Sequence, residues 1–478
     1  MKDKAQHSND NEIANLQLQG LNEAKNKNYL KALAHFQAAL KLNPALISLH
    51  INISNVYLHL NDIEKALQHI NQALRLDPLN AEVYTNLGRV FYKQGLYDPA
   101  IKNFEKALRL DKDLVAAHYN LAHSLTMQNQ LSRAATHYGE VLRLQPENAI
   151  ANLNLGFLEF NEGDYLEAEI HLKKALQYDA KNLELIKKLG ETYVALGKMN
   201  EAIETYLSAL DLSQDLSDVH HNLAILYLQS QEKTKALEHF SRALALDPSN
   251  DTAKHMLHAL RGEGVSETPP QYIANLFDQY ADYYNEHLKN KLNYQAHVLL
   301  RNALGRLLNK NPSAGRILDL GCGTGLCGLV FRDLATDLIG VDLSPNMIEK
   351  ARELGAYEKL IVSDINSYLE QSKEEAFDLI IAGDVLVYSG DLQKLFKNVA
   401  HNLKSEGRFA FTIEPLPNET KDDNFSLQPS GRFAHSIEYI HQLAEENDLL
   451  IEIEDDIVPR EHEGRPITGK LFVTKRLV

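Results

Sequence analysis

The sequence predicts a protein of two domains: an all-α superhelix of seven helix-pair repeats closed by a capping helix, then an α/β domain with a seven-stranded sheet. An alanine recurs every 34 residues through the first half of the chain. The second half changes to short apolar runs separated by helical stretches, and a glycine-rich turn follows the first run. A chain of 478 residues is also too long for one hydrophobic core.

Seven copies of one unit make up the first half. A small residue marks the same position in each copy: Ala32, Ala66, Ala100, Ala134, Ala168, Ala202 and Ala236. A large apolar residue marks a second: Phe36, Ile70, Phe104, Tyr138, Leu172, Tyr206 and Phe240. One such unit cannot bury its own apolar face, so the period indicates stacked helix pairs. We expect the alanines to lie where the helices cross.

Further positions of the unit resemble the tetratricopeptide repeat family. Leu-Gly pairs recur at 87–88, 155–156 and 189–190, and Asp-Pro pairs at 77–78 and 247–248. The resemblance covers about residues 11 to 249, and residues 249–261 read as the capping helix. The predicted domains are therefore 11–261 for the repeats, 262–270 for a linker, and 271–478 for the α/β domain.

One position of the first helix carries asparagine in five of the seven units: Asn52, Asn86, Asn120, Asn154 and Asn222. The family resemblance implies that first helices line a concave face. Because an amide both donates and accepts hydrogen bonds, this column predicts a groove that binds the main chain of an extended protein or peptide partner. The alternative is that the amides bridge adjacent repeats and bind no partner.

The second half predicts a mostly parallel sheet with an antiparallel last strand. Five apolar runs alternate with helical stretches: 316–320, 338–341, 360–363, 377–382 and 407–413. Uniformly apolar runs are typical of parallel strands that are covered on both faces. Two more runs, 449–453 and 470–474, have no long helix between them and are expected to form a hairpin. Ligands of such sheets bind beyond the carboxyl ends of the strands.

Three acidic residues follow successive strands at that edge. Asp319 ends the first strand, and a tight turn follows it with three glycines, Gly321, Gly323 and Gly325. Asp342 ends the second strand, where a carboxylate can accept hydrogen bonds from both hydroxyls of a ribose. Asp364 follows the third, where it can accept from an adenine amino group. The sequence therefore predicts an adenosine site.

Two adenosine cofactors compete for this pattern. Residues 323–328 match the dinucleotide fingerprint of nicotinamide enzymes, but the match begins late relative to the strand end. Asp319 instead places a carboxylate before the turn, where it can hold an ammonium group. A doubly wound domain with a tight glycine turn and no such site is the remaining alternative.

Residues 271–478 resemble the class I S-adenosylmethionine-dependent methyltransferases, which have a Rossmann-like fold. The resemblance implies that Asp319 and the three glycines face the methionine part of the cofactor and Asp342 its ribose. It assigns Met347 and Ile365 to the adenine faces and Asp364 to the adenine amino group. Four residues complete the expected cofactor contacts: Cys322, Leu343, Asp384 and Tyr280.

An aromatic segment, 272–284, precedes the sheet. Phe277, Tyr280 and Tyr284 fall on one helical face, which suggests a lid that closes over the cofactor, with a tyrosine against the sulfonium. The alternative is that this aromatic stripe only packs against the core.

The acceptor side is expected after the fourth strand. Asp384 and Tyr388 are candidates for shaping it, and the Asn/Asp-Pro-Pro-Tyr signature of enzymes that methylate amide or base nitrogens is absent there. His435 is a candidate general base, and Arg432 and Arg460 are candidates for binding an acidic substrate group. A capping or solvated role for His435 is the alternative.

The composition excludes several classes of partner. The net charge of −16 disfavours nucleic acid and anionic membranes. The N-terminus lacks an apolar export core, and no run is long enough to span a bilayer. The two cysteines, Cys322 and Cys327, suit neither a disulfide framework nor a metal site. We expect a cytoplasmic protein without a metal.

As a whole, the chain resembles bacterial proteins that fuse tetratricopeptide repeats to a methyltransferase domain. The leading hypothesis is an S-adenosylmethionine-dependent methyltransferase whose repeats recruit a protein that is, or carries, the acceptor. A second makes the acceptor a small acid or quinone-like metabolite, with the repeats serving assembly only. A third is a scaffold whose cofactor site is vestigial.

Overall fold

The computed structural model describes residues 2–280, 293–307, 315–372, 376–416, 423–462 and 465–477. The side chains of residues 2–8, 275, 279, 280 and 462 lie outside this description. The chain divides into two compact units, Met1–Gln214 and Asp215–Val478, each of which is described by itself. Within the described ranges, no helix has both the length and the apolar character needed to cross a bilayer.

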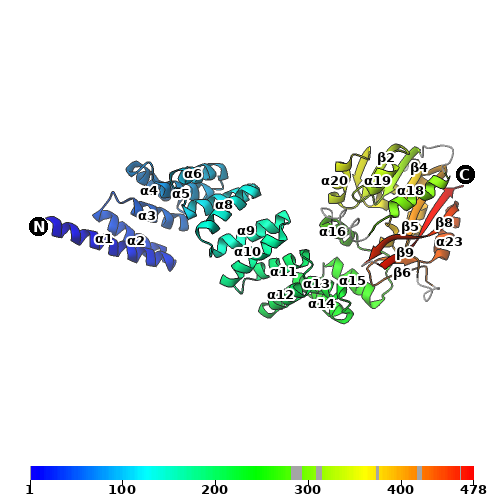
Figure 1. The fold of residues 1–478 in the computed structure, drawn as a ribbon, viewed down its shortest axis with the longest axis horizontal. Helices are drawn as coiled ribbons and strands as arrows, with labels where there is room; N and C mark the ends of the chain where they lie inside the picture. Colours follow the sequence, from blue (N-terminus) through cyan, green and yellow to red (C-terminus); the bar gives the residue numbers. More distant parts are fainter. Residues whose placement is uncertain are drawn as a thin grey trace. The chain divides into compact units, whose positions relative to one another are not determined.

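The first unit is built from six helix pairs (Figure 1). They are α1 (Lys2–Lys25) with α2 (Tyr29–Leu42), α3 (Ile47–His59) with α4 (Ile63–Leu76), α5 (Ala81–Lys93) with α6 (Tyr97–Leu110), α7 (Val115–Met127) with α8 (Leu131–Leu144), α9 (Ala149–Glu162) with α10 (Tyr165–Tyr178), and α11 (Leu183–Ala195) with α12 (Met199–Leu212). The alanine column is completely buried in every pair, from Ala32 to Ala202. The repeat period therefore reports close helix packing, as expected.

Glycine at 88 is required by the packing of α5 on α6. A β-carbon added to Gly88 would lie 2.5 Å from Cε1 of the buried Phe104 ring. We expect Gly88→Ala to lower the free energy of unfolding of this unit by about 1–3 kcal/mol. Gly139 in α8 is a matched control because a β-carbon there meets nothing within 4 Å. Gly139→Ala should raise the free energy of unfolding by about 0.5–1 kcal/mol, because alanine favours the helix. Urea unfolding followed by circular dichroism tests both, and a Gly88 variant as stable as the wild type would contradict the packing argument.

The seventh pair and the capping helix belong to the second unit. These are α13 (Ser217–Gln229), α14 (Lys233–Leu246) and α15 (Asp251–Arg261), and Gly262 ends α15 in the left-handed conformation. Among the described residues before the sheet lie also the helices α16 (Pro270–Tyr280) and α18 (Ala296–Leu307). Seven pairs and a cap are thus present, as the sequence predicts.

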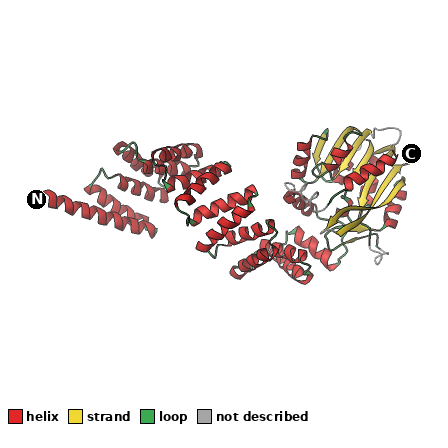
Figure 2. Ribbon diagram, in the orientation of Figure 1, coloured by secondary structure: helices red, strands yellow, loops and turns green. Residues whose placement is uncertain are grey.

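The sheet has seven strands in the order β3-β2-β1-β4-β5-β9-β8. Its strands are drawn in yellow in Figure 2. Five are parallel: β1 (Gly315–Leu320), β2 (Ala335–Asp342), β3 (Lys359–Val362), β4 (Phe377–Ala382) and β5 (Leu403–Ile413). The last two, β8 (Leu449–His462) and β9 (Arg465–Arg476), form a hairpin, and β9 pairs antiparallel with β5. The predicted Rossmann-like fold with an antiparallel last strand is confirmed.

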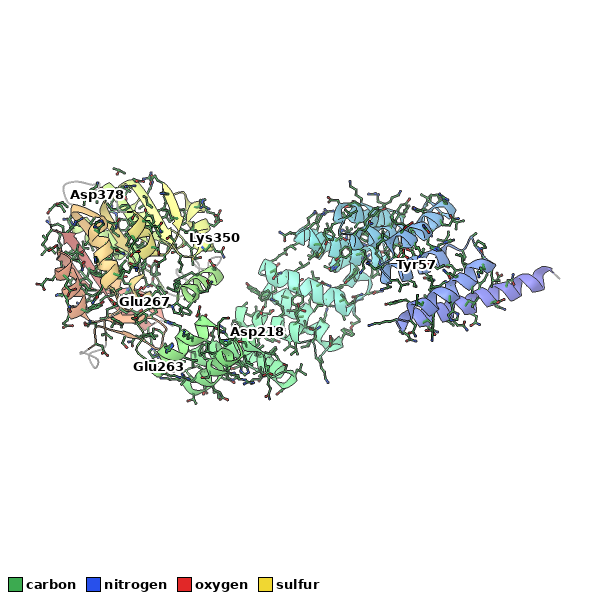
Figure 3. All side chains as sticks on the ribbon, turned by 180° about the vertical axis from the view of Figure 1, so that it is seen from behind. Tyr57, Asp218, Glu263, Glu267, Lys350 and Asp378 are labelled. Atoms are coloured by element: carbon green, nitrogen blue, oxygen red, sulfur yellow. The ribbon has the colours of Figure 1, made fainter. Side chains whose placement is uncertain are left out.

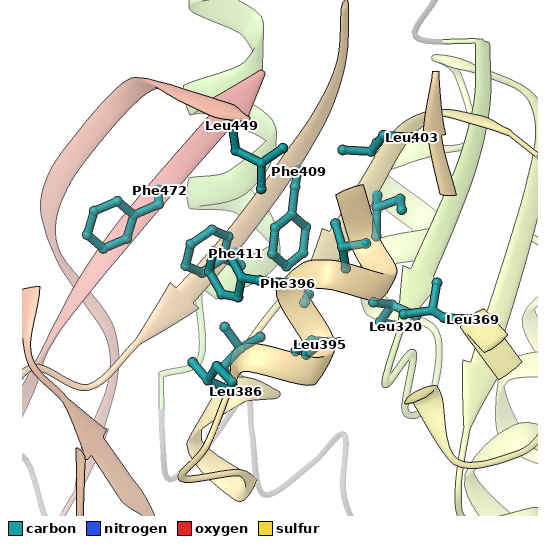
Figure 4. Packing of buried hydrophobic residues seen from close by; sticks show 14 of the residues in the cluster. Leu320, Leu369, Leu386, Leu395, Phe396, Leu403, Phe409, Phe411, Leu449 and Phe472 are labelled. Atoms are coloured by element: carbon teal, nitrogen blue, oxygen red, sulfur yellow. The ribbon is translucent and has the colours of Figure 1, made fainter. Parts of the chain in front are cut away.

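Helices cover both faces of the sheet. α18 and α19 (Leu326–Phe331) cover one face, where Leu300 and Phe331 pack on Ile317 and Leu379. The other face carries α21 (Ile365–Gln371), α22 (Gln393–Asn402) and α23 (Ile437–Glu446), and Phe396 from α22 packs against Phe409 and Phe411 (Figure 4). Burial on both faces explains the uninterrupted apolar runs, and it leaves the carboxyl ends of the strands to form a site.

A short hairpin between β5 and α23 was not expected from the sequence. It consists of β6 (Phe425–Leu427) and β7 (Phe433–His435), which pair antiparallel. The polar residues of segment 429–439 are typical of a turn that leads into a helix. The helix is present as α23, but His435 precedes it inside a strand, and Ser436 provides the cap.

Candidate functional site

The turn after β1 adopts the backbone that only glycine tolerates well. Gly321, Gly323 and Gly325 have φ angles of +65°, +52° and +92°. A β-carbon on Gly321 would also lie 2.6 Å from Val385 Cγ2. Cys322 is buried within this turn and donates its N–H to Val341 O at 3.0 Å, which ties the turn to the end of β2. The structure therefore brings the turn and the second predicted acidic position together.

Asp342, the last residue of β2, organises the same turn. Its carboxylate accepts hydrogen bonds from the Gly323 N–H and the Ser344 N–H, both at 2.9 Å. Burial raises the pKa of Asp342, although these backbone donors oppose the shift. Ser344 also caps α20 (Pro345–Leu354), which begins directly after it. Asp342 thus links the glycine turn to the start of the next helix.

Asp319 presents an unsatisfied carboxylate oxygen. Its Oδ2 accepts from the Tyr357 hydroxyl at 2.6 Å, whereas its Oδ1 is buried and has no hydrogen-bond partner among the described residues. Burial raises the pKa of Asp319 to about 7. Tyr357 also accepts from the Gly328 N–H at 3.0 Å, so one hydroxyl braces both Asp319 and α19. Tyr357 could not be predicted from the sequence, because no local pattern signals a contact with a residue 38 positions away.

The remaining predicted cofactor positions surround this edge of the sheet. Leu343 is half-buried and Met347, in α20, is completely buried. Asp364 caps α21 by accepting from the Ser367 N–H at 2.9 Å. Ile365 is half-buried and packs against the core. The contacts assigned to these residues remain predictions.

Helix α16 lies against the Asp342 loop. Asp278 accepts from the Ser344 hydroxyl, and from the Asn346 N–H at 3.4 Å. The Phe277 ring packs edge to face on the Tyr388 ring, with 5.4 Å between the ring centroids. Tyr280 ends α16, and its side chain lies outside the described residues, as does Tyr284. The aromatic helix therefore borders the site, and Asp278 is a contact that the sequence analysis did not identify.

A buried ion-pair cluster follows β4. Asp384 has a φ of +63° and pairs with Arg432 at 3.2 Å and with Arg460, while Arg460 also pairs with Glu414. Burial acts to raise the pKa of Asp384, but the charges of Arg432 and Arg460 outweigh it and hold the pKa below its usual value. Two carboxylates and two guanidinium groups leave this cluster with no formal net charge.

The cluster gives Arg460 partners within the chain. Its side chain is 8% exposed, and both of its carboxylate partners, Asp384 and Glu414, belong to the protein. These pairs stabilise the site, and substrate binding by Arg460 remains a prediction. Arg432 is more exposed, and its guanidinium lies over the Tyr388 ring at 5.3 Å from the centroid. Substrate binding by Arg432, and a role for Tyr388, remain predictions.

His435 lies inside the fold. The imidazole is completely buried in β7, and its Nε2 donates to Ser389 O at 2.8 Å. Its Nδ1 is buried and lacks a partner among the described residues, and burial lowers the pKa of His435 to about 4. A buried imidazole with a lowered pKa and one nitrogen bonded to the main chain differs from the solvated residue that was the alternative, and the role of His435 as a general base remains a prediction. Its hydrogen bond to Ser389 O holds the loop after β4 in place.

The capping helix packs on the same hairpin. His255 in α15 bonds through Nε2 to Gly431 O at 2.8 Å and lies against the Tyr272 ring. The predicted linker is also bound, because Ser266 O accepts from the N–H groups of Gly390 and Asp391 at 3.0 Å. Glu267 in that segment (Figure 3) bridges to Ser389. Segment 262–270 is therefore part of the packed second unit.

Four of the five asparagines of the column line one of two cavities, and Asn154 lines neither. Asn52, Asn86 and Asn120 line a cavity of about 720 Å³ in the first unit. Asn222 lines one of about 790 Å³ in the second unit, between α13, α15 and α16. The amides of Asn86, Asn120 and Asn154 each donate one N–H to the carbonyl one turn earlier in their own helix. Binding of a partner by this column remains a prediction.

Comparisons with known families match both halves of the chain. A model described as a methyltransferase domain matches residues 311–455. Models described as TPR or tetratricopeptide repeats match residues 54–95, 88–129 and 190–231, residues 119–182, and residues 217–250. Both resemblances inferred from the sequence are confirmed.

Individual relatives match only parts of the chain. A malonyl-[acyl-carrier protein] O-methyltransferase of Salmonella typhimurium is 26% identical over 148 residues, 31% of this chain and 55% of the relative. A ubiquinone biosynthesis O-methyltransferase of Rhodopseudomonas palustris is 29% identical over 125 residues, 25% of this chain and 49% of the relative. A solved structure of Pseudomonas aeruginosa pilF aligns with 47% of this chain and 99% of its own at 19% identity and a TM-score of 0.40. The chain spans 18% to 55% of the length of the first curated relatives.

Proposed function

Because the chain carries tetratricopeptide repeats followed by a methyltransferase domain, we propose that it uses S-adenosylmethionine to methylate an acceptor that its repeats recruit. The recruited molecule is a protein that is itself methylated or that carries the acceptor group. Tethering would raise the effective concentration of the acceptor at the transfer site.

One observation carries the choice of cofactor. Asp319 has a buried carboxylate oxygen to which no described residue donates, and it lies two residues before a glycine turn whose backbone admits a close ligand. A buried acceptor without a partner costs free energy, and an ammonium group is the donor that suits a carboxylate best. The residues present therefore fit the methionine end of S-adenosylmethionine. Asp342 and Asp364 would hold its ribose and adenine.

The protein would mainly bind and orient the reactants. When bound, S-adenosylmethionine supplies a methyl group on a positively charged sulfur, and transfer is an in-line displacement. Helix α16 would help exclude water, since Phe277 and Asp278 contact both the acceptor side and the ribose loop. No histidine is needed for alignment, and His435 serves by positioning Ser389.

The names of two relatives support different kinds of acceptor. One of them is named for malonyl-[acyl-carrier protein], in which the acceptor is attached to a carrier. Another is named for ubiquinone biosynthesis, which favours the small-molecule alternative. Incubating the chain with labelled S-adenosylmethionine and a cell extract distinguishes the two kinds of acceptor. Label appears in protein if the acceptor is carried by a protein, and in small molecules if it is a metabolite. Label in neither fraction, together with no cofactor binding by calorimetry, would refute the proposal.

A deletion that tests recruitment by the repeats has to leave α15 in place, because α15 packs on the methyltransferase domain. A deletion of residues 1–261 would strip the capping helix from the β6–β7 hairpin and damage the methyltransferase domain. A deletion of residues 1–214 leaves the second compact unit whole. We expect this shorter chain to bind the cofactor as the full chain does and to label the recruited acceptor poorly.

Asp319 predicts a pH dependence of cofactor binding. Its carboxyl must be ionised to hold an ammonium group, and its pKa in the ligand-free chain is raised to about 7. Affinity should therefore fall as the pH drops below about 7, by up to about tenfold per pH unit. Calorimetry in buffers of different ionisation enthalpy should detect proton release on binding near pH 6.5. Asp319→Asn should bind weakly and without this pH dependence; an equally steep profile in the variant would exclude Asp319 as its source.

A further inference from the structure

Arg89 in α5 is a half-buried arginine without a carboxylate partner. Its Nη1 donates to the amide oxygens of Asn55 at 2.6 Å and Asn86 at 3.1 Å. Its Nε and Nη2 have no hydrogen-bond partner in the part of the chain that the structure describes. By contrast, the half-buried Arg316 and Arg408 each form an ion pair with a carboxylate. The Arg89 guanidinium is therefore held in place by two amides and keeps its charge uncompensated.

The guanidinium borders the cavity of about 720 Å³ in the first unit. Most of the polar lining of this cavity is uncharged and consists of asparagines, Gln145, Thr85 and Tyr119. One acidic residue, Glu82, is in the lining; it is exposed and makes no ion pair with Arg89 among the described contacts. The only cationic side chain in the lining is Arg89 itself.

Arg89 and Lys93 both act on His59 as positive charges. His59 on α3 has its pKa lowered by burial and then by the charges of Arg89 and Lys93. Burial also lowers the pKa of Arg89. A partly desolvated cation without a countercharge is costly in a folded protein, and the chain as a whole is strongly acidic, with a net charge of −16. A carboxylate that entered this cavity would remove that cost.

We propose that this cavity binds an acidic side chain on an extended segment of the recruited protein, with its carboxylate on Nε and Nη2 of Arg89. The planar guanidinium matches a carboxylate with two parallel hydrogen bonds. Asn52 and Asn55 add amide groups beside it for the main chain of the segment. The asparagine column alone would hydrogen-bond the main chain of a bound segment whatever its side chains. Arg89 adds a preference for a segment that carries Asp or Glu. This proposal rests on the recruitment proposed above.

A carboxylate fits better than a phosphate group. A phosphorylated side chain carries nearly two charges and is usually bound by several cations. The cavity offers one guanidinium, and Asn55 and Asn86 occupy one of its two terminal nitrogens. The two free donors, Nε and Nη2, lie on one edge of the guanidinium, which is the edge that pairs with a single carboxylate.

Labelled peptides test the proposal on the full chain without a methyl donor. Three fluorescent ten-residue Gly-Ser peptides would carry glutamate, glutamine or phosphoserine at the same positions, and fluorescence polarisation would measure their affinities. We expect the glutamate peptide to bind about tenfold tighter than the glutamine peptide, and to weaken as salt is added. Arg89→Met should abolish this preference. Arg109→Met is the matched control, since Arg109 in α6 is exposed and does not line the cavity.

Thermal unfolding separates ligand binding from a structural role of Arg89. If Arg89 exists to bind a carboxylate, Arg89→Met leaves the Tm unchanged or raises it. A lowered Tm with unchanged peptide affinity would assign Arg89 to bracing α3 against α5 and overturn the proposal. Equal affinity for the glutamate and glutamine peptides, a preference for phosphoserine, or an equal effect of Arg109→Met would also overturn it. Glutamate-selective binding in a chain that labels no protein would sustain this site while refuting recruitment of the acceptor.

Discussion

Asp342→Ala is expected to weaken binding of S-adenosylmethionine by about 100-fold or more. Two charge-assisted hydrogen bonds to the ribose hydroxyls would be lost, each worth about 1.5–3 kcal/mol. The substitution also leaves the N–H groups of Gly323 and Ser344 without their acceptor, so the glycine turn loses one of its two ties to β2. Isothermal titration calorimetry on the full chain measures the change.

A second aspartate on the same strand provides the control. Asp337 lies near the start of β2 and pairs with Arg316 at 2.7 Å, away from the glycine turn. Asp337→Ala should leave cofactor affinity unchanged, whereas Asp342→Asn should weaken it, because an amide presents only one oxygen. Melting curves without ligand show whether each variant is folded. Wild-type affinity in a folded Asp342→Ala chain would remove the adenosine site from the proposal.

Asp384→Ala is expected to lower the free energy of unfolding of the second unit by about 3–5 kcal/mol. Arg460 would remain buried with only Glu414 opposite it, and Arg432 would lose its nearer carboxylate. Alanine is also strained at the φ of +63° that Asp384 adopts. Urea unfolding monitored by tyrosine fluorescence measures the loss.

Two further variants isolate the charge. Asparagine tolerates a positive φ, so Asp384→Asn removes the charge without the backbone strain and should cost less than alanine. Asp333→Ala is the control at an exposed ion pair. Asp333 pairs with Arg301 and its side chain is 68% exposed, so its loss should lower the free energy of unfolding by less than about 1 kcal/mol.

The pH dependence of the Asp384 effect follows from the direction of its pKa. The folded-state pKa of Asp384 is lowered, so its contribution is fully present above the unfolded pKa of about 3.9 and is lost as the pH falls through the folded value. The difference in free energy of unfolding between wild type and Asp384→Asn should therefore be constant near pH 7 and should disappear only below about pH 4. A difference that vanished between pH 6 and 8 would mean that another group titrates.

Much of the site could be predicted because parallel strands bring their carboxyl ends to one edge. To predict the positions of Asp319 and Asp342, it was enough to recognise the ends of two apolar runs and the glycine turn between them. The hairpin that contains His435 could not be recognised in this way, since strands of three residues are too short to show a two-residue period. His435 therefore appeared to be a polar residue near a helix start, although the fold buries it completely.

The missed contacts all join distant segments. Tyr357 reaches Asp319 across 38 residues, Asp278 reaches Ser344 across 66, and His255 reaches Gly431 across 176. Arg460 and Asp384, 76 residues apart, form an ion pair that buries the Arg460 side chain inside the protein. No local pattern encodes such pairs, because each partner is set by how strands and helices pack.

The sequence by itself determined the repeat architecture, the parallel sheet and the chemistry of the glycine turn. These properties follow from periodic burial and from backbone conformations that are written into short stretches of chain. Only the tertiary structure decided which charges are paired, which histidine is enclosed, and which arginine keeps donors available. Those outcomes depend on desolvation and on partners brought in from elsewhere in the chain, so they exist only once the elements are packed.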